Sequence, residues 1–508
     1  MCIRDRSLTD SLNEILQEKL QNGETVVDEY GVEMTEIILT VGSSSKGTVG
    51  FSELNVDYDV KFDVKSKILI DNMAYLFQAG KISGALIVAP KGVLDNWDIN
   101  EINRHLPDHI ERKVLVWQPN HTQRWTKDYK DMVEKDSTGT LNIFLMNVEA
   151  FATVKGCKHA EEFILTHDTL LTIDESTTIK NPKAKRTKNL IALSPEAKYR
   201  RILTGFPITK APLDLYSQCY FLHPNLLGYS SYYAFRSRYA IVRRQQMGGR
   251  MFDNIVGFQR LDELQQIVKQ FSVRYTKNEC LDLPSKNYIK RSVELTPEHE
   301  KAYVQMKQEA IMTLEEETFS TMNVLTQLMR LQQVVAGSLR SETGETICLK
   351  NNRLQAVLDV LEETAGKVVI FAVFRTDIER LAEILRKKYG ENSVATYYGD
   401  TPQSERQNII TRFQDPDNEL KYFISNPQTG GRGITLTEAN VIIYYSNSYD
   451  LELRIQSEDR IHRIGQDDKC TYIDLVSKNT VDEHILKTLL NKVKISNEVL
   501  GEIREWFD

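Results

Sequence analysis

The stretch TLLTIDESTTIKNPKAKRTKN (169–189) decides the fold, because an apolar run ends there in two adjacent acids. An apolar run of this length is typical of a strand buried on both faces of a parallel sheet. Asp174 and Glu175 then fall at the carboxyl end of the strand, where open parallel sheets bind their ligands. Two carboxylates there suit a nucleotide hydrolase, one holding Mg²⁺ and one orienting water. The alternative is a plain helix N-terminus, where acids are also favoured.

Short apolar runs alternate with helical patterns on both sides of this stretch. This rhythm is typical of a parallel sheet with helices on both faces. The runs are ALIVAP (85–90), VLVW (114–117), NIFLMN (142–147) and RRILTG (200–205), and later KVVIFAVF (367–374), SVATYYG (393–399), KYFISNP (421–427), ANVIIYYS (439–446) and TYIDLVS (471–477). Between them, helical patterns dominate 210–345. The predicted fold class is α/β, with two parallel-sheet lobes and a helical insertion between them.

The predicted domains follow this rhythm. Residues 1–64 form an unassigned N-terminal segment, 65–225 a first lobe, 226–345 a helical insertion with the inter-lobe linker, and 346–508 a second lobe. A chain of 508 residues is too long for one core. Six cysteines without a CxxC pair argue against zinc ribbons and disulfide frameworks, and indicate a reducing, cytoplasmic setting. The net charge of −7 does not exclude nucleic-acid binding, since a local basic track suffices.

Two further elements support the nucleotide-hydrolase interpretation. The run LTGFPI places Thr204 and Gly205 at the end of the next strand, beside the same edge of the sheet. The segment IQSEDRIHRIGQ holds Arg460 and Arg463 three residues apart, which predicts one shared helix face. Two such arginines suit stabilisation of a γ-phosphate during its transfer. In isolation they are also compatible with a solvated basic helix face, but their order along the chain together with the acids favours the hydrolase.

These segments resemble the motifs of the SNF2 branch of superfamily 2 helicase-like ATPases. The matching segments are LIVAPKGVLDNW (86–97, motif Ia), DEST (174–177, II), LTGFPI (203–208, III), FSVRYTKNECLDLPSK (271–286, the link between lobes), KVVIFAVFRTDIERL (367–381, IV), NPQTGGRGITLTEANVIIYY (426–445, V) and QSEDRIHRIGQ (456–466, VI). The resemblance covers about residues 65–495 and is most specific in motifs V and VI. It implies two RecA-like lobes, ATP and Mg²⁺ as cofactors, and duplex DNA as partner.

The resemblance also implies a role for each matching residue. Asp174 would lie in the Mg²⁺ shell, Glu175 would be the catalytic base, and Thr204 with Gly205 would couple the nucleotide state to movement. The remaining implied residues are Arg460 and Arg463 as arginine fingers, and Gln456, Gly431 and Gly433 as nucleotide-binding positions. Ser176 and Thr177 depart from the DEAH form of motif II. This departure bears on how ATP hydrolysis is coupled to movement and not on hydrolysis itself.

The phosphate-binding loop departs most from the expected pattern. Such a loop needs glycines followed by Lys and Ser or Thr at the start of a helix. Lys65 and Ser66 occupy the Lys-Ser positions, and Ser66 would also serve as a metal ligand, but Asp59 and Val64 stand where glycines belong. A second candidate, GSSSKGTV (42–49), has both glycines at the right spacing but Thr48 and Val49 where the Lys and the Ser or Thr belong, and it is interpreted as a turn-rich loop. Three explanations stay open: a degenerate loop, an artificial junction near Lys65 that replaces the native start, or an unusual N-terminal domain.

Two basic segments are candidates for a nucleic-acid track. The segment 230–250 interleaves aromatics with arginines, and the segment 180–189 follows the acids directly. Their candidate DNA contacts are Arg236, Arg238, Arg243 and Arg244, and Lys183, Lys185 and Arg186. A helical surface with a half-buried aromatic face is the alternative for the first. Neither pattern suits base reading, so we expect sequence-independent phosphate contacts that weaken with salt.

The predicted function is ATP hydrolysis coupled to movement along double-stranded DNA. A strand-separating helicase is one alternative, although no separation hairpin is evident in the sequence. A catalytically impaired ATPase that serves as a DNA-binding scaffold is the other, because the loop glycines are absent. The few accessory segments favour a phage or bacterial protein in the cytoplasm of a bacterial or phage-infected cell.

Overall fold

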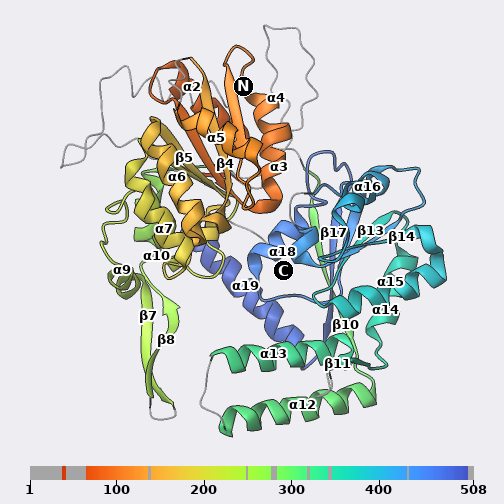
Figure 1. Ribbon diagram of the computed structural model, residues 1–508. Coiled ribbons are helices and arrows are strands. Elements are labelled where there is room, and N and C mark those ends of the chain that lie inside the picture. The colour runs from red at the N-terminus through yellow and green to blue at the C-terminus, as the bar shows by residue number, and fades with distance from the viewer. Residues whose placement is uncertain are drawn as a thin grey trace, which may run out of the picture. The chain divides into compact units, whose positions relative to one another are not determined.

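A computed structural model describes residues 37–41, 64–134, 139–247, 250–275, 283–316, 321–340, 346–431 and 434–500. The chain divides into two compact units (Figure 1). The first comprises 1–208, 212–239 and 260–281, and the second comprises 209–211, 240–259 and 282–508. Each unit is described by itself. No helix of the described residues is long and apolar enough to cross a membrane.

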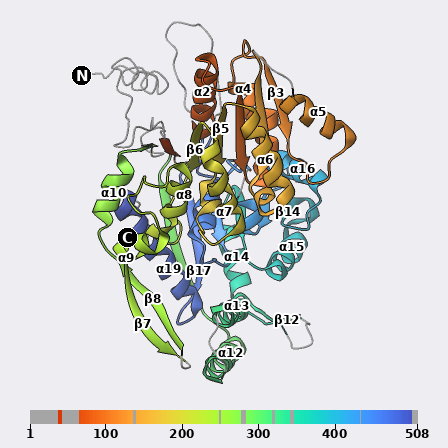
Figure 2. The ribbon, with the colours of Figure 1, turned by 60° about the vertical axis from the view of Figure 1, so that its left-hand side comes forward.

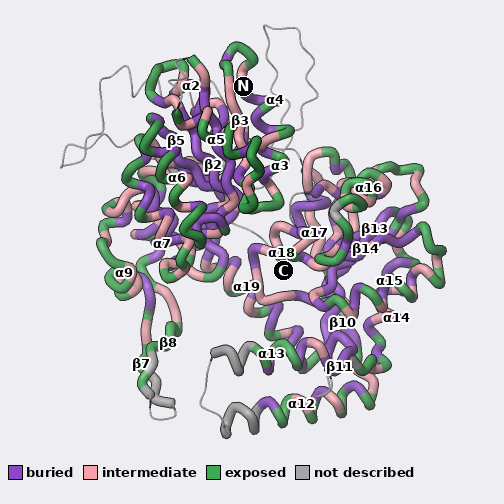
Figure 3. The backbone as a smooth tube through the Cα atoms, in the orientation of Figure 1, coloured by how far each residue is buried: buried purple, intermediate pink, exposed green. Residues whose placement is uncertain are grey.

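The first unit is built on a seven-stranded parallel sheet of order β3-β4-β2-β5-β6-β1-β9. The strands are β1 Ile37–Val41, β2 Gly84–Ala89, β3 Arg112–Val116, β4 Leu141–Asn147, β5 Thr169–Asp174, β6 Tyr199–Thr204 and β9 Ser272–Tyr275. Every residue of β2 and β5 is buried, as an apolar run in a parallel sheet predicts. Figure 3 shows this buried layer in purple.

Helices cover both faces of this sheet, and the alternation of side chains along β4 shows how. Ile143 and Leu145 face a core that includes Leu69 and Met73 of α2 (Val64–Gln78). Phe144 points to the other face, where its ring packs against Phe163 of α6 (Val154–Thr166), with ring centroids 5.5 Å apart. In the described part of this unit, the other helices of eight or more residues are α5 Gln123–Glu134, α7 Lys185–Leu193, α8 Leu215–Leu222, α9 Tyr232–Tyr239 and α10 Leu261–Lys269.

The second unit contains a six-stranded parallel sheet of order β10-β17-β16-β13-β15-β14. The strands are β10 Lys286–Val293, β13 Lys367–Phe371, β14 Val394–Tyr397, β15 Tyr422–Ser425, β16 Ala439–Tyr444 and β17 Cys470–Ser477. The accompanying helices are α14 Arg353–Glu363, α15 Arg375–Tyr389, α16 Gln403–Gln414, α17 Pro427–Gly430, α18 Leu451–Glu458 and α19 Val481–Leu500. Separate apolar cores occupy the two faces of the sheet. The predicted α/β class with two parallel-sheet lobes is therefore confirmed.

The segment 210–345 differs in part from the helical insertion expected there. It does contain a long helix pair, α12 Pro297–Glu316 and α13 Thr321–Ala336. It also contributes β9 to the first sheet, β10 to the second, and an antiparallel hairpin of β7 Ala240–Met247 and β8 Arg250–Phe258. The helical interpretation of 230–250 is therefore wrong from Ala240 onward, because β-prone residues extend the chain there after α9 ends.

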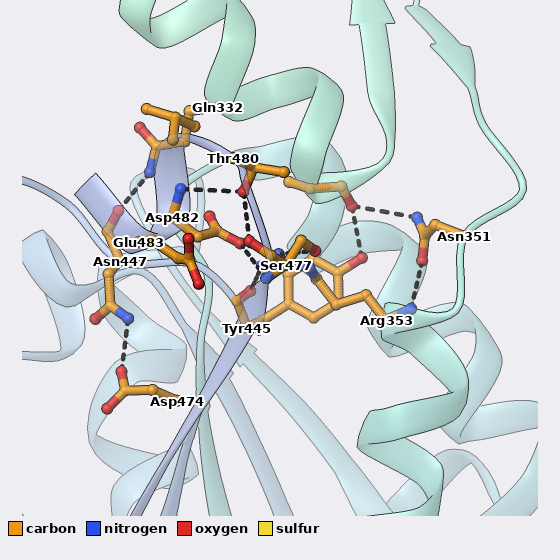
Figure 4. Close-up of polar contacts among 12 residues, drawn as sticks. Gln332, Asn351, Arg353, Tyr445, Asn447, Asp474, Ser477, Thr480, Asp482 and Glu483 are labelled. Carbon is orange, nitrogen blue, oxygen red and sulfur yellow. Dashed lines mark hydrogen bonds and ion pairs between the residues drawn. The ribbon is translucent and has the colours of Figure 1, made fainter. Parts of the chain in front are cut away.

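Buried polar side chains attach α13 to the second sheet (Figure 4). Gln332 donates to the carbonyl oxygen of Asn447, and the Tyr445 hydroxyl donates to the carbonyl oxygen of Ala336 over 2.7 Å. Arg353 donates to the Tyr445 carbonyl oxygen and pairs with Asp482, both side chains being buried. The bonds of Gln332 and Tyr445 fix the C-terminal end of α13 against the end of the sheet. The buried pair of Arg353 and Asp482, which is costly to break, joins α14 to α19.

Candidate functional site

Asp174 ends β5 and is almost fully buried, with 6% of its surface exposed. Its Oδ2 accepts a hydrogen bond from the indole Nε1 of Trp97 over 3.0 Å, and its Oδ1 accepts one from the Glu175 backbone N–H over 2.9 Å. Trp97 comes from the segment that matches motif Ia and is itself buried. The two donors hold the carboxylate in one orientation, as residues behind a metal ligand usually do.

Glu175 adopts a left-handed backbone conformation, with φ 53° and ψ 61°. Residues other than Gly, Asn and Asp seldom adopt it, because in L-residues Cβ crowds the following carbonyl oxygen. Such strain is concentrated at functional sites, where the surrounding structure maintains it. Glu175 directly follows the buried Asp174. Its left-handed backbone turns the chain sharply from β5 into the short helix Ser176–Ile179.

A glutamine that the sequence analysis missed joins the segments matching motifs II and III. The Ser176 hydroxyl donates to Oε1 of Gln218 over 2.6 Å, and Gln218 Nε2 donates to the carbonyl oxygens of Pro207 and Asp214, each over 2.8 Å. Gln218 lies on α8 and is 1% exposed. Gln218 belongs to none of the matched motifs. Because it lies 42 residues from Ser176 in sequence, no local pattern predicts their contact.

Thr204 and Gly205 lie beside the acids, as expected from parallel strands that end at one edge. Asp174 of β5 is the register partner of Leu203 of β6, so Thr204 follows immediately. The Thr204 hydroxyl accepts from the Phe206 backbone N–H over 3.1 Å, which caps the turn after the strand.

The expected phosphate-binding residues lie at the start of α2, which begins at Val64. Ser66 is buried in its first turn, 5% exposed. The Lys65 side chain is outside the described part, and so is Asp59. The predicted helix start is confirmed, whereas the contacts of Lys65 and Ser66 with phosphate or metal stay predictions.

Arg460 and Arg463 do not share a helix face, so that prediction was wrong. Helix α18 ends at Glu458, and both arginines lie in the turn that follows. The Arg460 backbone N–H donates to the Ser457 carbonyl oxygen, three residues back instead of four, which departs from the α-helical pattern. The Arg460 Nε donates to the Gln456 carbonyl oxygen over 2.8 Å and its Nη1 to the Ile434 carbonyl oxygen over 2.9 Å. Arg460 thereby ties the motif VI segment to the motif V segment.

A buried network behind this turn was not predicted. Arg454 of α18 pairs with Glu458 over 2.9 Å and with Asp474 of β17, and its guanidinium lies 3.5 Å from the Tyr444 ring centroid. The Tyr288 hydroxyl donates to Glu458 over 2.8 Å. Burial and the neighbouring Glu458 carboxylate raise the pKa of Tyr288 well above its usual value, so its hydroxyl stays a donor. The network anchors α18 and, through it, the arginine-bearing turn.

The remaining predicted nucleotide residues lie near that turn. Gln456 is half-buried on α18, with Nε2 3.4 Å from Oε1 of Glu452. Gly431 follows α17, and a Cβ there would lie 2.2 Å from the Pro427 carbonyl oxygen and 3.5 Å from Cβ of Ser457. The glycine therefore permits close packing of α17 on α18. Gly433 lies outside the described residues.

Some of the candidate DNA contacts are exposed, whereas others are half-buried or bonded to other groups of the protein. Lys183, Lys185, Arg243 and Arg244 are exposed. Arg186 donates from Nε to the Thr178 carbonyl oxygen over 3.0 Å, so it stabilises the loop after the acids. Arg238 forms a paired interaction with Glu263, at 3.1 and 2.6 Å, which lowers the pKa of that carboxyl. Arg236 is half-buried on α9.

The residues at the end of β5 fit a Mg²⁺ ion held through water. Mg²⁺ retains most of its water and needs one or two protein carboxylates, and Asp174 supplies one with a fixed orientation. Among the described residues there is no group of three or more His, Cys, Asp or Glu side chains that could hold an ion directly. Asp59 and Val64 stand at the two positions before Lys65 where a phosphate cradle has glycines.

Comparisons with known proteins agree with this arrangement. The model of the SNF2-related domain matches residues 18–338, and that of the helicase conserved C-terminal domain matches 350–465. An uncharacterized ATP-dependent helicase of Mycoplasma genitalium is 25% identical over 83% of this chain and 38% of its own length. Human SWI/SNF-related matrix-associated actin-dependent regulator of chromatin subfamily A member 1 is 26% identical over 85% of this chain and 40% of its own. The chain thus spans about two fifths of these relatives.

Among solved structures, the SWI2/SNF2 ATPase core of Sulfolobus solfataricus in complex with dsDNA is 22% identical, with a TM-score of 0.35. The alignment covers 96% of this chain and 93% of that one. The first family match begins upstream of Lys65, and it therefore includes β1 (Ile37–Val41).

Proposed function

The chain belongs to the SNF2-related domain family, and from this membership we propose that it is an ATP-driven motor that moves along double-stranded DNA. One observation carries the proposal: Asp174 and Glu175 stand at the carboxyl end of β5, the first oriented by Trp97 and the second held in a left-handed conformation. A structural acid pair would need neither feature. Hydrolysis of a nucleotide needs both carboxylates at fixed positions.

In this proposal Asp174 binds Mg²⁺ through its water shell, with Ser66 as a further metal ligand. The ion, when bound, neutralises charge on the phosphates. Glu175 orients the attacking water and accepts its proton. Arg460 and Arg463 stabilise negative charge on the γ-phosphate, and the bond from Arg460 to the Ile434 carbonyl oxygen supports this role by fixing the turn that carries both. The other proposed nucleotide contacts are Lys65, Gln456, Gly431 and Gly433.

The proposed partner is duplex DNA, held through its phosphates. Lys183 and Lys185 are exposed directly after the catalytic acids, and Arg186 fixes the loop that carries Lys183. Phosphate contacts of this kind carry no sequence information, so we propose sequence-independent binding. Thr204 and Gly205, beside the acids, are proposed to couple hydrolysis to movement. The phage or bacterial origin and the cytoplasmic location stay predictions.

A scaffold without ATPase activity is the second candidate, and the composition of the phosphate loop favours it. Val64 precedes Lys65 where a glycine would let the backbone wrap a phosphate, and Asp63 adds negative charge nearby. The same departure supports the proposal of a degraded phosphate loop in this chain.

DNA-stimulated phosphate release separates the two candidates. We would measure it on the chain itself, on Val64→Gly combined with Asp59→Gly, and on each of these with Glu175→Gln. The motor proposal expects stimulated release in at least the glycine-restored chain and its loss on Glu175→Gln. If neither chain hydrolyses ATP while both bind duplex DNA, the scaffold is correct and the motor proposal fails.

A further inference from the structure

The chain enters the second unit for the last time at residue 282, directly before β10. The entry segment, residues 284–288, joins the end of the segment that matches the family's link between lobes (271–286) to the first residues of this strand. Backbone pairing holds β10 beside β17 through all eight residues of the strand (Figure 1 and Figure 2). The strand is therefore held at the edge of its sheet without the help of side chains.

Three alternate residues of the entry segment nevertheless bond to the region of the arginine-bearing turn. The carbonyl oxygen of Pro284 accepts from Nε2 of His462 over 2.9 Å. Lys286 Nζ lies 3.3 Å from Oε2 of Glu458, and the Tyr288 hydroxyl donates to the same oxygen over 2.8 Å. The bonded residues are 178, 172 and 170 positions apart in sequence, so these bonds join two distant segments and are no part of local structure.

Glu458 and His462 lie on either side of Arg460 in sequence. Glu458 is the last residue of α18 and is 1% exposed, whereas His462 lies between the two arginines and is 5% exposed. A carbonyl oxygen can only accept a hydrogen bond, so Nε2 of His462 carries the proton in its bond to Pro284. The turn that bears Arg460 and Arg463 is thus attached to the entry segment both before and after Arg460.

The buried carboxylate of Glu458 makes this attachment sensitive to the place of the entry segment. Burying a carboxylate is unfavourable unless charged or hydrogen-bonding groups surround it. Arg454 donates to Oε1 from the same helix, whereas Lys286 and Tyr288 supply Oε2 from the entry segment. Displacement of the segment would remove both partners of Oε2, so we expect Glu458 and the turn after it to move with the segment.

We propose that the entry segment sets the position of Arg460 and Arg463, with Lys286 and His462 as positioning residues for nucleotide hydrolysis. The inference rests on the proposed function, in which the two arginines stabilise charge on the γ-phosphate. It adds a physical route through bonded groups, by which a movement of the link between lobes reaches these arginines. The link continues into Pro284, and Pro284 bonds to the turn.

The first test compares DNA-stimulated phosphate release by His462→Leu and His462→Gln. It uses the full chain with the glycine-restored loop where only that form releases phosphate. We expect His462→Leu to lower kcat about tenfold with little change in the KM for ATP, because misplacing a catalytic group by about 1 Å can cost about 10²-fold. Glutamine keeps a side-chain N–H donor, so His462→Gln should retain most of the kcat.

His299→Leu is the matched control for the loss of a buried histidine. His299 is 1% exposed, and its Nε2 also bonds to a carbonyl oxygen, that of Val334 on α13. The control should lower the thermal unfolding temperature about as much as His462→Leu does, but it should leave kcat unchanged. If His462→Leu keeps the kcat of the chain, or if His299→Leu lowers kcat equally, the proposal is wrong.

A second pair of variants tests the entry segment itself. Lys286→Met should lower kcat in the same way as His462→Leu, with the KM for ATP again little changed. Arg291→Met is its control on the same strand, because Arg291 pairs with Glu363 of α14 and not with the turn. Equal kcat values for these two variants would contradict a special role of the entry segment.

Hydrogen exchange without nucleotide distinguishes failure of this inference from failure of the motor proposal. The Leu436 backbone N–H donates to the Arg460 carbonyl oxygen over 2.9 Å, so its exchange rate reports on the turn. Lys286→Met and His462→Leu should accelerate this exchange, whereas Arg291→Met should not. Accelerated exchange without phosphate release from any chain would refute the motor and support the coupling of entry segment and turn. Unchanged exchange in both variants would overturn the coupling itself.

Discussion

At the residue scale, Glu175 is both the proposed catalytic base and a residue with a strained backbone. Its left-handed conformation costs about 1–2 kcal/mol for an L-residue, and glycine alone is free of that cost. We therefore expect Glu175→Gly to unfold at a higher denaturant concentration than Glu175→Ala, the reverse of the usual order. Both variants should lose DNA-stimulated phosphate release. If alanine is the more stable of the two, the backbone at this position is not strained.

Asp377 is the buried acid that gives the second unit a pH dependence. Burial raises its pKa to about 7, and the nearby Arg353 and Arg380 oppose this rise only in part. Among the described residues its Oδ2 has no hydrogen-bond partner. A carboxyl that is protonated in the folded state up to this pH, but ionised in the unfolded state from about pH 4, makes folding less favourable as pH rises between these values.

The Asp377→Asn variant should remove this dependence. We expect the variant and the original chain to have similar denaturation midpoints near pH 4, and the variant to be the more stable one at pH 8. The difference is at most about 4 kcal/mol, the free energy of a three-unit pKa shift. Urea titrations at both pH values, followed by a probe in the second unit, provide the measurement. A difference that is independent of pH would assign the effect to packing instead.

The sequence was sufficient to predict the location of residues at the ends of buried strands. Asp174 and Thr204 end apolar runs, and the ends of neighbouring parallel strands meet. It was insufficient for Trp97 and Gln218, which reach Asp174 and Ser176 across 77 and 42 positions. Such contacts depend on the packing of helices against the sheet, and no local sequence pattern predicts this packing.

At the element scale, Gln218 connects α8 to two segments of the site. It accepts from Ser176 and donates to the carbonyl oxygens of Pro207 and Asp214, all inside the protein. We expect Gln218→Leu to lower the kcat of DNA-stimulated hydrolysis with little change in the KM for ATP. The reason is that Gln218 positions the acid-bearing turn and, in the proposal, does not itself touch nucleotide. Each carbonyl oxygen left without a partner also costs about 1–3 kcal/mol.

A double-mutant cycle separates positioning from general destabilisation. Ser176→Ala removes one of the three hydrogen bonds, and its effect on kcat should be largely absent when Gln218 is already leucine. Additive effects of the two substitutions would mean that the residues act independently. Gln355→Leu, on the exposed side of α14, is the control, since its side chain bonds only locally to Asp359.

Elements differed in how well the sequence predicted them. The parallel strands were found because each is a buried apolar run. The turn after α18, in contrast, is tied by a bond from Arg460 to the carbonyl oxygen of Ile434, which lies 26 residues away in sequence. The β7–β8 hairpin was missed because Arg243 and Arg244 of β7 were interpreted together with the aromatics of α9 as one segment, 230–250. Two β-prone runs, AIVRRQQM and RMFDNIVGF, flank Gly248 and Gly249, a hairpin signal that the sequence does contain.

At the scale of the whole molecule, charge decides how the chain meets DNA. With a net charge of −7, the chain as a whole repels a polyanion, so binding must rest on local basic clusters. The exposed Lys183 and Lys185 form one such cluster beside the proposed catalytic acids. Exposed lysines elsewhere on the first unit, such as Lys127 and Lys130 of α5, provide a comparison with the same change in net charge.

Removal of two lysines should therefore have different effects at the two places. For Lys183→Ala with Lys185→Ala, we expect weaker DNA binding on every sequence and a plot of log affinity against log salt that is shallower by about 2, one for each lost phosphate contact. Lys127→Ala with Lys130→Ala should leave the slope unchanged. Titrations of labelled duplex at several salt concentrations give both slopes. If both double variants lost the same DNA affinity, binding would depend only on net charge. The loop after the proposed catalytic acids would then not be the DNA-binding site.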